Sequence, residues 1–323
     1  MAAAKQIVRR AQLYVPGSSM RFLEKSLLIP SIDSIAYDLE DSVTPSKKPE
    51  ARKNITSILS RPQRPPGIRE LAVRINAVDS GFALSDLTSI LTSDAASSNL
   101  DCIVIPKVDA PKDLHFVTDV LRHLLPARHG EGSPNPIRLV ALVESARALV
   151  DLREICRASP YLTGLTFAAE DFARDLSLTR TPDLTEFLYA RSAIVAAARA
   201  YDLPSAIDLV STTFRGEEGM RQLREECEGG KRLGFNGKQC IHPDQVEVVQ
   251  SMFSPSESEV EWAMRVVVCD EKADAQGRGA WTLDGKMIDV PVVGRAKAIV
   301  MKAEVCGVDV EALREKWKDE QPE

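Results

Sequence analysis

Short runs of apolar residues alternate with longer segments of helical periodicity through most of the chain. Segment 48–59 has helical periodicity, with Ile55, Ile58 and Leu59 on one face. Segments 184–201 and 217–233 follow the same period. This alternation is typical of βα units around a parallel sheet, and eight strands are the number that closes a (β/α)8 TIM barrel. The eight predicted strands are residues 11–17, 34–41, 71–76, 102–108, 137–145, 164–171, 205–210 and 235–242.

The pattern changes after His242. Residues 243–252 and 257–272 have helical periodicity, residues 275–291 are rich in glycine and irregular, and a further helix runs to about residue 307. A barrel of this kind takes roughly 250 residues, which leaves about 70 of the 323 residues unexplained. We therefore predict an α/β fold with a barrel domain over residues 1–250 and a C-terminal helical and irregular extension over residues 251–323.

Composition excludes several classes of protein. Lys and Arg number 41 against 47 Asp and Glu, a formal charge of −6, whereas a nucleic-acid-binding domain is expected to be basic. An anionic small molecule stays compatible, because local basic clusters can oppose the overall sign. No apolar run approaches the ~18 residues of a membrane helix. We expect neither nucleic acid nor membrane as a partner.

Cysteine spacing and the N-terminus bear on the compartment. The six cysteines form no CxxC pair and no zinc-like spacing, which favours a reducing environment. The first twelve residues are basic and free of acids, as in a transit peptide, but a strand pattern begins at about residue 11 and leaves almost no room for a removable segment. We expect a cytoplasmic protein, with a mitochondrial location as the alternative.

Charged residues gather where the predicted strands end. In parallel barrels the active site lies at this carboxyl-terminal face, so these residues are the first candidates for chemistry. Nucleotide-binding GxGxxG and GxxxxGK[ST] motifs are absent from the sequence, and no Ser–His or Cys–His constellation suggests covalent catalysis. The candidates are Asp38, Glu40 and Asp41 after strand two, Arg74 in strand three, Lys107 after strand four, Glu144 after strand five, Glu170 and Asp171 after strand six, Asp208 in strand seven and His242 after strand eight.

Two neighbouring strands supply the carboxylates that a hard cation needs. Glu144 follows the apolar run LVALV, and Glu170 and Asp171 follow the next strand. Mg²⁺ prefers oxygen ligands and usually takes one or two carboxylates. The alternative is that these acids form salt bridges with nearby cations, and residue type alone does not separate Asp171 from Glu170.

Basic and aromatic residues near the same face have two interpretations each. The planar guanidinium of Arg74 suits a substrate carboxylate, or it pairs with the acids after strand two, and both can hold at once. Tyr14 is either a pocket wall or a core residue. Arg21, Lys25 and Lys48 are candidates for phosphate contacts, although isolated surface cations are usually only solvated.

Eight segments together resemble the HpcH/HpaI aldolase/citrate lyase family, and within it the citrate lyase β-subunit-like proteins. They occur in the family's order from about residue 10 to residue 300. The segments are LYVPGSS, YDLEDSVTPSKKPEAR, VRIN, IPKV, LVES, AAEDFARDL, FNGKQCIHPDQ and GAWTLDGKMIDVP.

The resemblance implies a (β/α)8 barrel, commonly a homotrimer, that uses Mg²⁺ to break or form a carbon–carbon bond between a small 2-oxo acid and a CoA thioester. The expected reaction converts citramalyl-CoA to pyruvate and acetyl-CoA. The family's motifs place the metal on Glu144 and Asp171, with Glu144 and Arg74 also binding substrate. They assign CoA-thioester contacts to Tyr14, Arg21, Lys25 and the backbone at Ile241 and His242, with Arg21 standing where close relatives have Lys.

The extension has its own implied role. Asp289, in KMIDVP, matches an aspartate that a neighbouring subunit contributes as acid/base, so the extension is expected to act as a lid on that neighbour's site. Malyl-CoA or β-methylmalyl-CoA cleavage and a malate-synthase-like activity are alternatives, because one methyl group in a pocket is worth only ~1–3 kcal/mol. A citrate lyase-type subunit that works on an acyl-carrier protein is the second alternative, and the retained Asp289 favours the stand-alone CoA enzyme.

Overall fold

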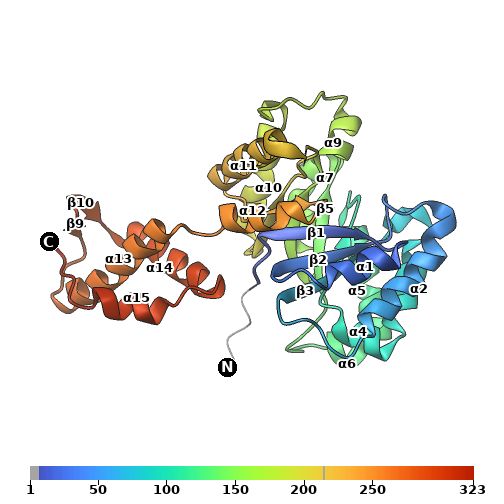
Figure 1. The fold of residues 1–323 in the computed structure, drawn as a ribbon, viewed down its shortest axis with the longest axis horizontal. Coiled ribbons are helices and arrows are strands. Elements are labelled where there is room, and N and C mark those ends of the chain that lie inside the picture. Colours follow the sequence, from blue (N-terminus) through green and yellow to red (C-terminus); the bar gives the residue numbers. More distant parts are fainter. Residues whose placement is uncertain (1–6, 214) are drawn as a thin grey trace. The chain divides into compact units, whose positions relative to one another are not determined.

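A computed structural model describes residues 7–213 and 215–323 and divides the chain into two compact units, one ending at Phe253 and the other comprising Ser254–Glu323. Up to Phe253 the eight parallel strands form a closed barrel in the order β1 to β8, which confirms the predicted fold (Figure 1). Closure comes from β8 pairing with β1, with Gln12 opposite Gln239. The strands are β1 Ala11–Pro16, β2 Ile32–Asp38, β3 Ile68–Arg74, β4 Cys102–Ile105, β5 Arg138–Val143, β6 Leu162–Phe167, β7 Ser205–Asp208 and β8 Gly237–Cys240.

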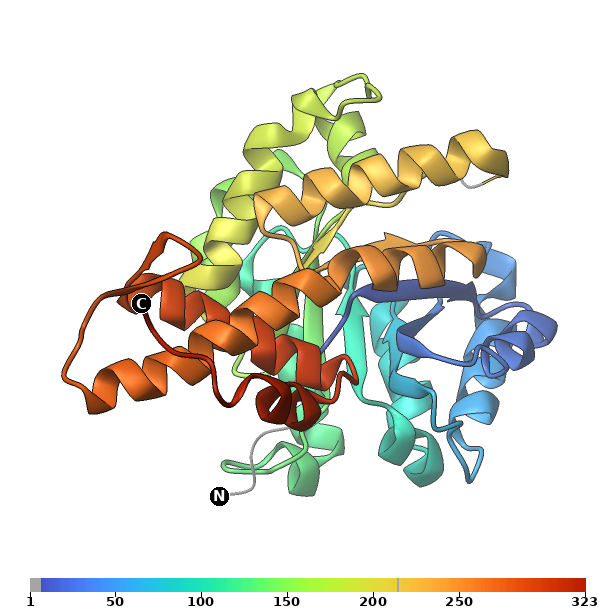
Figure 2. The same cartoon turned by 60° about the vertical axis from the view of Figure 1, so that its left-hand side comes forward.

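Helices cover the outside of the strands, as Figures 1 and 2 show. The predicted helices at 48–59, 184–201 and 217–233 are present, the second beginning only at Leu188 after a short 3-10 turn at Thr185–Phe187. The helices of this unit are α1 Met20–Ser26, α2 Lys48–Leu59, α3 Ala83–Leu91, α4 Asp94–Asn99, α5 Pro111–Leu124, α6 Pro126–His129, α7 Ala146–Val150, α8 Leu152–Arg157, α9 Ala169–Leu176, α10 Leu188–Ala200, α11 Gly216–Leu233 and α12 Asp244–Phe253.

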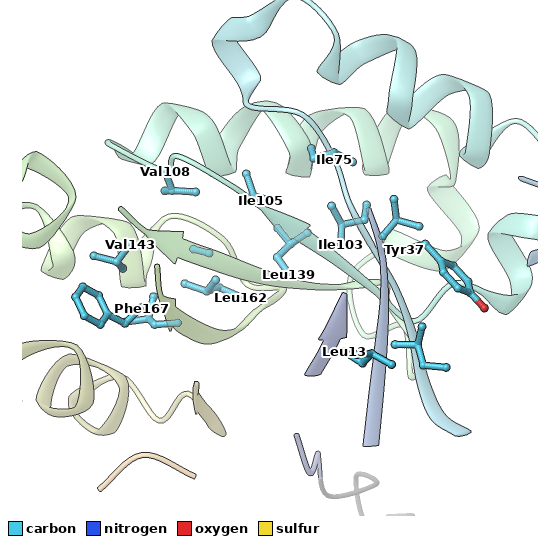
Figure 3. Close-up of a cluster of buried hydrophobic side chains, with 14 of the residues drawn as sticks. Leu13, Tyr37, Ile75, Ile103, Ile105, Val108, Leu139, Val143, Leu162 and Phe167 are labelled. Carbon is cyan, nitrogen blue, oxygen red and sulfur yellow. The ribbon is translucent and has the colours of Figure 1, made fainter. Parts of the chain in front are cut away.

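Both faces of the barrel strands are buried, which explains why the strands read as almost continuous apolar runs. Outward-facing residues such as Leu13, Ile103 and Phe167 pack against the helices in one large cluster (Figure 3). A smaller cluster of mostly short side chains fills part of the interior. It consists of Ala36, Ala72, Cys102, Val104, Val140 and Leu142.

A buried ion pair closes the amino-terminal end of the barrel. The Arg9 guanidinium donates to both carboxylate oxygens of Glu70 at 2.8 Å and to the hydroxyls of Thr163 and Ser205 at 3.1 Å, while the Ser34 hydroxyl donates to Glu70. Although burial works the other way, Arg9 holds the pKa of Glu70 below its ordinary value. These partners satisfy the charged groups of Arg9 and Glu70, so this buried ion pair has a structural role.

The unit after Phe253 has its own core, built from residues of α13, the hairpin and α14, among them Val266, Trp281 and Val293. Its elements are α13 Glu257–Ala275, β9 Trp281–Leu283, β10 Lys286–Ile288, α14 Val290–Val305 and α15 Val310–Trp317. The prediction of purely irregular structure over residues 275–291 was wrong, because β9 and β10 form an antiparallel hairpin there. Its turn is Asp284-Gly285, both with positive φ, a dipeptide that favours tight hairpins.

Three features of the structure bear on the predicted location of the protein. No helix among the described residues is long and apolar enough to cross a membrane. All six cysteines are free thiols, and five of them are buried. Residues 1–6 of the basic N-terminal segment lie outside the described residues.

Candidate active site

The ends of β2 and β3 hold a two-pronged ion pair at the barrel mouth. The Nε and Nη2 atoms of Arg74 lie 2.7 Å from the two oxygens of Asp38, and the guanidinium stacks 4.7 Å from the centre of the Tyr14 ring. Asp38 also accepts hydrogen bonds from the backbone N–H groups of Glu40 and Ser42, which fixes the turn after β2. Arg74 is thereby oriented before any ligand arrives, and the predicted pairing with the acids of strand two is confirmed.

A second cation joins the same acids. The Lys107 ammonium donates to Oε1 of Glu40 and lies 3.6 Å from Asp41, while Oε2 of Glu40 lies 3.0 Å from Nη1 of Arg74. Glu40 therefore lies between two cations. Lys107 follows β4 with a φ of 50°, in the left-handed region that non-glycine residues rarely adopt.

Glu144 is the least compensated carboxylate of the mouth. It directly follows β5, is 5% exposed, and its buried Oε2 atom has no hydrogen-bond partner among the described residues. Burial, together with the negative charges of Glu40 and Asp171, raises the pKa of Glu144 to about 8, although the Lys107 ammonium and backbone N–H act in the opposite direction. An unpartnered buried carboxylate oxygen is costly by itself and is the kind of group that a cation stabilises.

The structure separates Asp171 from Glu170, which the sequence could not. Both lie in the first turn of α9, but the charge of Asp171 acts on Glu144 whereas Glu170 is 55% exposed in its side chain and pairs with Arg180. The Asp171 side chain is 24% exposed and, among the described residues, pairs only with Arg174, whose side chain is 77% exposed. Glu144 and Asp171 thus offer carboxylate oxygens that fit a hard divalent cation with room for further ligands. Across residues 7–213 and 215–323, no group of three or more His, Cys, Asp or Glu is placed to hold a metal ion.

The predicted CoA contacts come from two places. Arg21 and Lys25 are both exposed and lie one helical turn apart on α1, which puts them on one face. At the end of β8 the backbone N–H groups of Ile241 and His242 both donate to Oε1 of Gln245. The Gln245 side chain therefore already occupies those two donors, and the Ile241 side chain is left 43% exposed.

The structure corrects two predictions, the direction of Asp208 and the role of Lys48. Asp208 does not face the mouth, because its carboxylate is fully buried against Arg191 of α10, 2.6 Å away, on the outside of the barrel. Lys48, considered for phosphate binding, instead buries its ammonium against the carbonyls of Leu39 and Glu40. It braces the loop that carries Glu40, a role for which the sequence gives no signal.

Asp289 belongs to the C-terminal unit. It caps the amino terminus of α14, where its carboxylate accepts from the N–H of Val292 at 3.2 Å. Apolar side chains flank it, with Met287 69% and Val290 76% exposed.

Comparison with known proteins identifies the family. The model of the HpcH/HpaI aldolase/citrate lyase family matches residues 10–243. The human protein named citramalyl-CoA lyase, mitochondrial, is 37% identical over 310 residues, covering 93% of this chain and 86% of that protein. Citrate lyase subunit beta of Escherichia coli K12 is 35% identical over 305 residues, covering 94% and 96%. The crystal structure of CitE from Mycobacterium tuberculosis in complex with magnesium, acetoacetate and coenzyme A superposes with a TM-score of 0.70 at 27% identity, over 93% of this chain and 99% of that one. The chain belongs to the HpcH/HpaI aldolase/citrate lyase family.

Proposed function

We propose that this chain is a Mg²⁺-dependent carbon–carbon lyase that cleaves a CoA thioester into a 2-oxo acid and acetyl-CoA, with citramalyl-CoA giving pyruvate and acetyl-CoA. The observation that carries the proposal is the buried Glu144 carboxylate. Its Oε2 has no hydrogen-bond partner among residues 7–213 and 215–323 and lies at the end of a barrel strand, where the charge of Asp171 acts on it. Membership of a lyase family and the 37% identity to a citramalyl-CoA lyase support the reaction class.

Glu144 and Asp171 would hold the metal. Their oxygen donors suit Mg²⁺, and the related CitE structure contains magnesium beside acetoacetate and coenzyme A. When bound, Mg²⁺ supplies Lewis-acid stabilisation of the negative charge that develops on a substrate oxygen. This role makes a Schiff-base lysine unnecessary, in keeping with Lys107 being ion-paired to Glu40.

Arg74 orients the 2-oxo acid. Asp38 occupies its Nε–Nη2 edge, so a substrate carboxylate would approach the edge that carries Nη1, now shared with Glu40. The Tyr14 ring under the guanidinium limits its movement, which lowers the entropy lost on binding. As the carbon–carbon bond breaks, the substrate hydroxyl loses its proton and becomes the carbonyl of the 2-oxo acid, and the bonding electrons pass to the α-carbon of the thioester. The resulting enolate of acetyl-CoA takes up a proton at its methylene carbon, so the whole reaction neither consumes nor releases a proton.

Asp289 is the proposed donor of that proton, and it abstracts a methyl proton in the reverse direction. We propose that the C-terminal unit acts as a lid and brings Asp289 to the site of a neighbouring subunit in a homotrimer. Mixing Asp289→Ala with Glu144→Ala protein tests this arrangement. Recovery of part of the activity is expected, because some sites then combine an intact barrel mouth with an intact aspartate, and no recovery would mean that Asp289 acts within its own chain.

CoA recognition is proposed for the exposed face of α1 and the end of β8. Arg21 and Lys25 would meet phosphate groups, while the apolar Ile241 side chain and the backbone at Ile241 and His242 would line the path of the thioester arm. Six free cysteines suit a reducing compartment, either cytoplasm or the mitochondrial matrix.

Mass spectrometry of the products tests the function directly. The purified chain is incubated with citramalyl-CoA, malyl-CoA or β-methylmalyl-CoA, with Mg²⁺ or with EDTA. We expect acetyl-CoA and pyruvate from citramalyl-CoA with Mg²⁺ only. Cleavage of none of the three, or cleavage that EDTA leaves unchanged, contradicts the proposal, and free CoA with the hydroxy acid intact indicates thioester hydrolysis instead. Gel filtration with and without an acyl-carrier protein separates a self-sufficient trimer from a carrier-dependent subunit.

A further inference from the structure

Three acids contribute charge at the barrel mouth, but Glu40 is already paired with Arg74 and Lys107, whereas Asp171 pairs with the exposed Arg174. The charges of Glu40 and Asp171 both act on Glu144. Mg²⁺ usually takes one or two carboxylates and keeps its other positions for water and substrate. A third carboxylate on the ion would occupy a position that the 2-oxo acid needs, so something has to keep Glu40 away from it.

Lys107 acts on two of these three acids. Its ammonium donates to Oε1 of Glu40, and its positive charge also acts on Glu144. Arg74 holds the other oxygen of Glu40 at 3.0 Å. Each oxygen of Glu40 is thus ion-paired with a cation. Oε2 of Glu40 and Oε2 of Glu144 both lack a hydrogen-bond partner in the described part of the chain, but Glu144 has no ion pair there.

The backbone conformation of Lys107 is unusual for a lysine. Its φ of 50° is left-handed, a conformation that costs a non-glycine residue on the order of 1 kcal/mol or more and persists where surrounding contacts fix it. One such contact is the ion pair between the Lys107 ammonium and Glu40. Glycine would adopt this turn without strain but would lose the ammonium.

We propose that Lys107 is a positioning residue that keeps Glu40 out of the metal's coordination sphere and thereby leaves a position open for the 2-oxo acid. The inference rests on the proposed function in one respect, namely that Glu144 and Asp171 hold the metal. The proposal predicts that the affinities for the metal and for the 2-oxo acid change in opposite directions. Removing the Lys107 ammonium strengthens metal binding, because Glu40 is released as a third carboxylate, and weakens binding of the 2-oxo acid.

Metal and pyruvate binding to the full chain test the proposal without turnover. Mg²⁺ is titrated by calorimetry, with Mn²⁺ followed by electron paramagnetic resonance, and pyruvate is then titrated into the Mg²⁺-loaded protein. We expect Lys107→Met to bind Mg²⁺ about three- to tenfold more tightly and pyruvate at least tenfold more weakly than wild type. Lys107→Arg keeps the charge and should bind the metal within about twofold of wild type.

A double variant identifies the cause. In the Lys107→Met background, Glu40→Gln should return the Mg²⁺ affinity to the wild-type value, because the released ligand is removed. Unchanged or weaker metal binding by Lys107→Met overturns the proposal, as does tighter binding that persists in the double variant. Should Lys107→Met fail to fold, Glu40→Gln alone decides: metal affinity within about twofold of wild type supports the proposal, and a tenfold loss shows that Glu40 is itself a ligand.

Failure of the proposed function looks different. Wild-type protein that binds neither Mg²⁺ nor Mn²⁺, or that binds them equally well after Glu144→Gln, contradicts the metal site itself. Wild-type protein that binds Mg²⁺ through Glu144, combined with no gain in Lys107→Met, contradicts only the role of Lys107.

Discussion

Glu144 should make the metal-free protein less stable as the pH rises, and replacing it by glutamine should remove this effect. Burial and the neighbouring charges of Glu40 and Asp171 raise the pKa of Glu144 in the folded chain from 4.5 to about 8. A carboxyl with a raised folded-state pKa contributes its full stability below pH 4.5, and that contribution is lost as the pH rises towards 8. In Glu144→Gln no proton leaves, so the pH dependence from this position disappears.

The size of the effect follows from the two pKa values. Each pH unit between them corresponds to about 1.4 kcal/mol, so between pH 5 and pH 7 the wild-type chain should lose roughly 2 to 3 kcal/mol of unfolding free energy relative to Glu144→Gln. Any rearrangement that brings water to the carboxylate reduces this figure, which makes it an upper limit. Saturating Mg²⁺ should cancel the loss in wild type and do nothing for the variant, because a ligand that binds only the folded state stabilises it.

The assay is denaturant unfolding at pH 5, 6 and 7 in EDTA, followed by far-ultraviolet circular dichroism. All three tryptophans, Trp262, Trp281 and Trp317, belong to the C-terminal unit, so their fluorescence reports that unit separately. Glu70→Gln is the matched control, since Arg9 lowers the pKa of Glu70 and the variant should be destabilised most at pH 7. A wild-type loss that differs from that of Glu144→Gln by less than about 0.5 kcal/mol would refute the reasoning.

Three further variants test separate parts of the structure. Asp289→Ala should abolish turnover and keep Mg²⁺ binding. The control Asp309→Ala removes an equivalent helix cap from α15, at a cost of about 1 kcal/mol of stability, and should keep turnover. Equal activity of the two variants would remove Asp289 from the mechanism. Asp171→Asn should weaken Mg²⁺ binding at least tenfold by calorimetry, and an unchanged affinity would point to another ligand. Gly237→Ala should prevent a stable barrel, because a Cβ there would lie 1.8 Å from the Arg9 carbonyl oxygen; a melting temperature like that of wild type would contradict the tight β8–β1 closure.

Sequence reasoning located the barrel because the apolar runs and the helical periods are long and regular. It failed where one residue decides the direction of a side chain. Strand β7 has only four residues, all buried, so no alternation of polar and apolar positions indicated that Asp208 faces Arg191 instead of the mouth. Glu170 and Asp171 are neighbours on α9, so helix geometry turns their side chains about 100° apart. The packing of α9 against the barrel decides that Glu170 is exposed and that Asp171 acts on Glu144.

Two turns differ in whether the sequence predicts their backbone conformation. The Asp284-Gly285 dipeptide inside TLDGKMI is typical of a tight hairpin, so the sequence contains a signal for the turn between β9 and β10. The left-handed backbone of Lys107 had no such signal, since a lysine after a proline gives no reason to expect a positive φ. The Lys107 ammonium pairs with Glu40, which follows another strand, so the surroundings of this turn come from parts of the chain that are distant in sequence.

The charges of the mouth explain why an acidic protein suits an anionic substrate. Asp38 is neutralised by Arg74 and Glu40 by Lys107. Glu144 and Asp171 remain, and the exposed Arg174 contributes little to the second of them because solvent screens such a pair. Once Glu144 has released the proton that its raised pKa retains, the two carboxylates carry the charge that one divalent cation cancels, whereas a monovalent ion would leave the site negative. The mouth becomes able to accept a carboxylate substrate only once that cation is bound, so metal should bind before the 2-oxo acid.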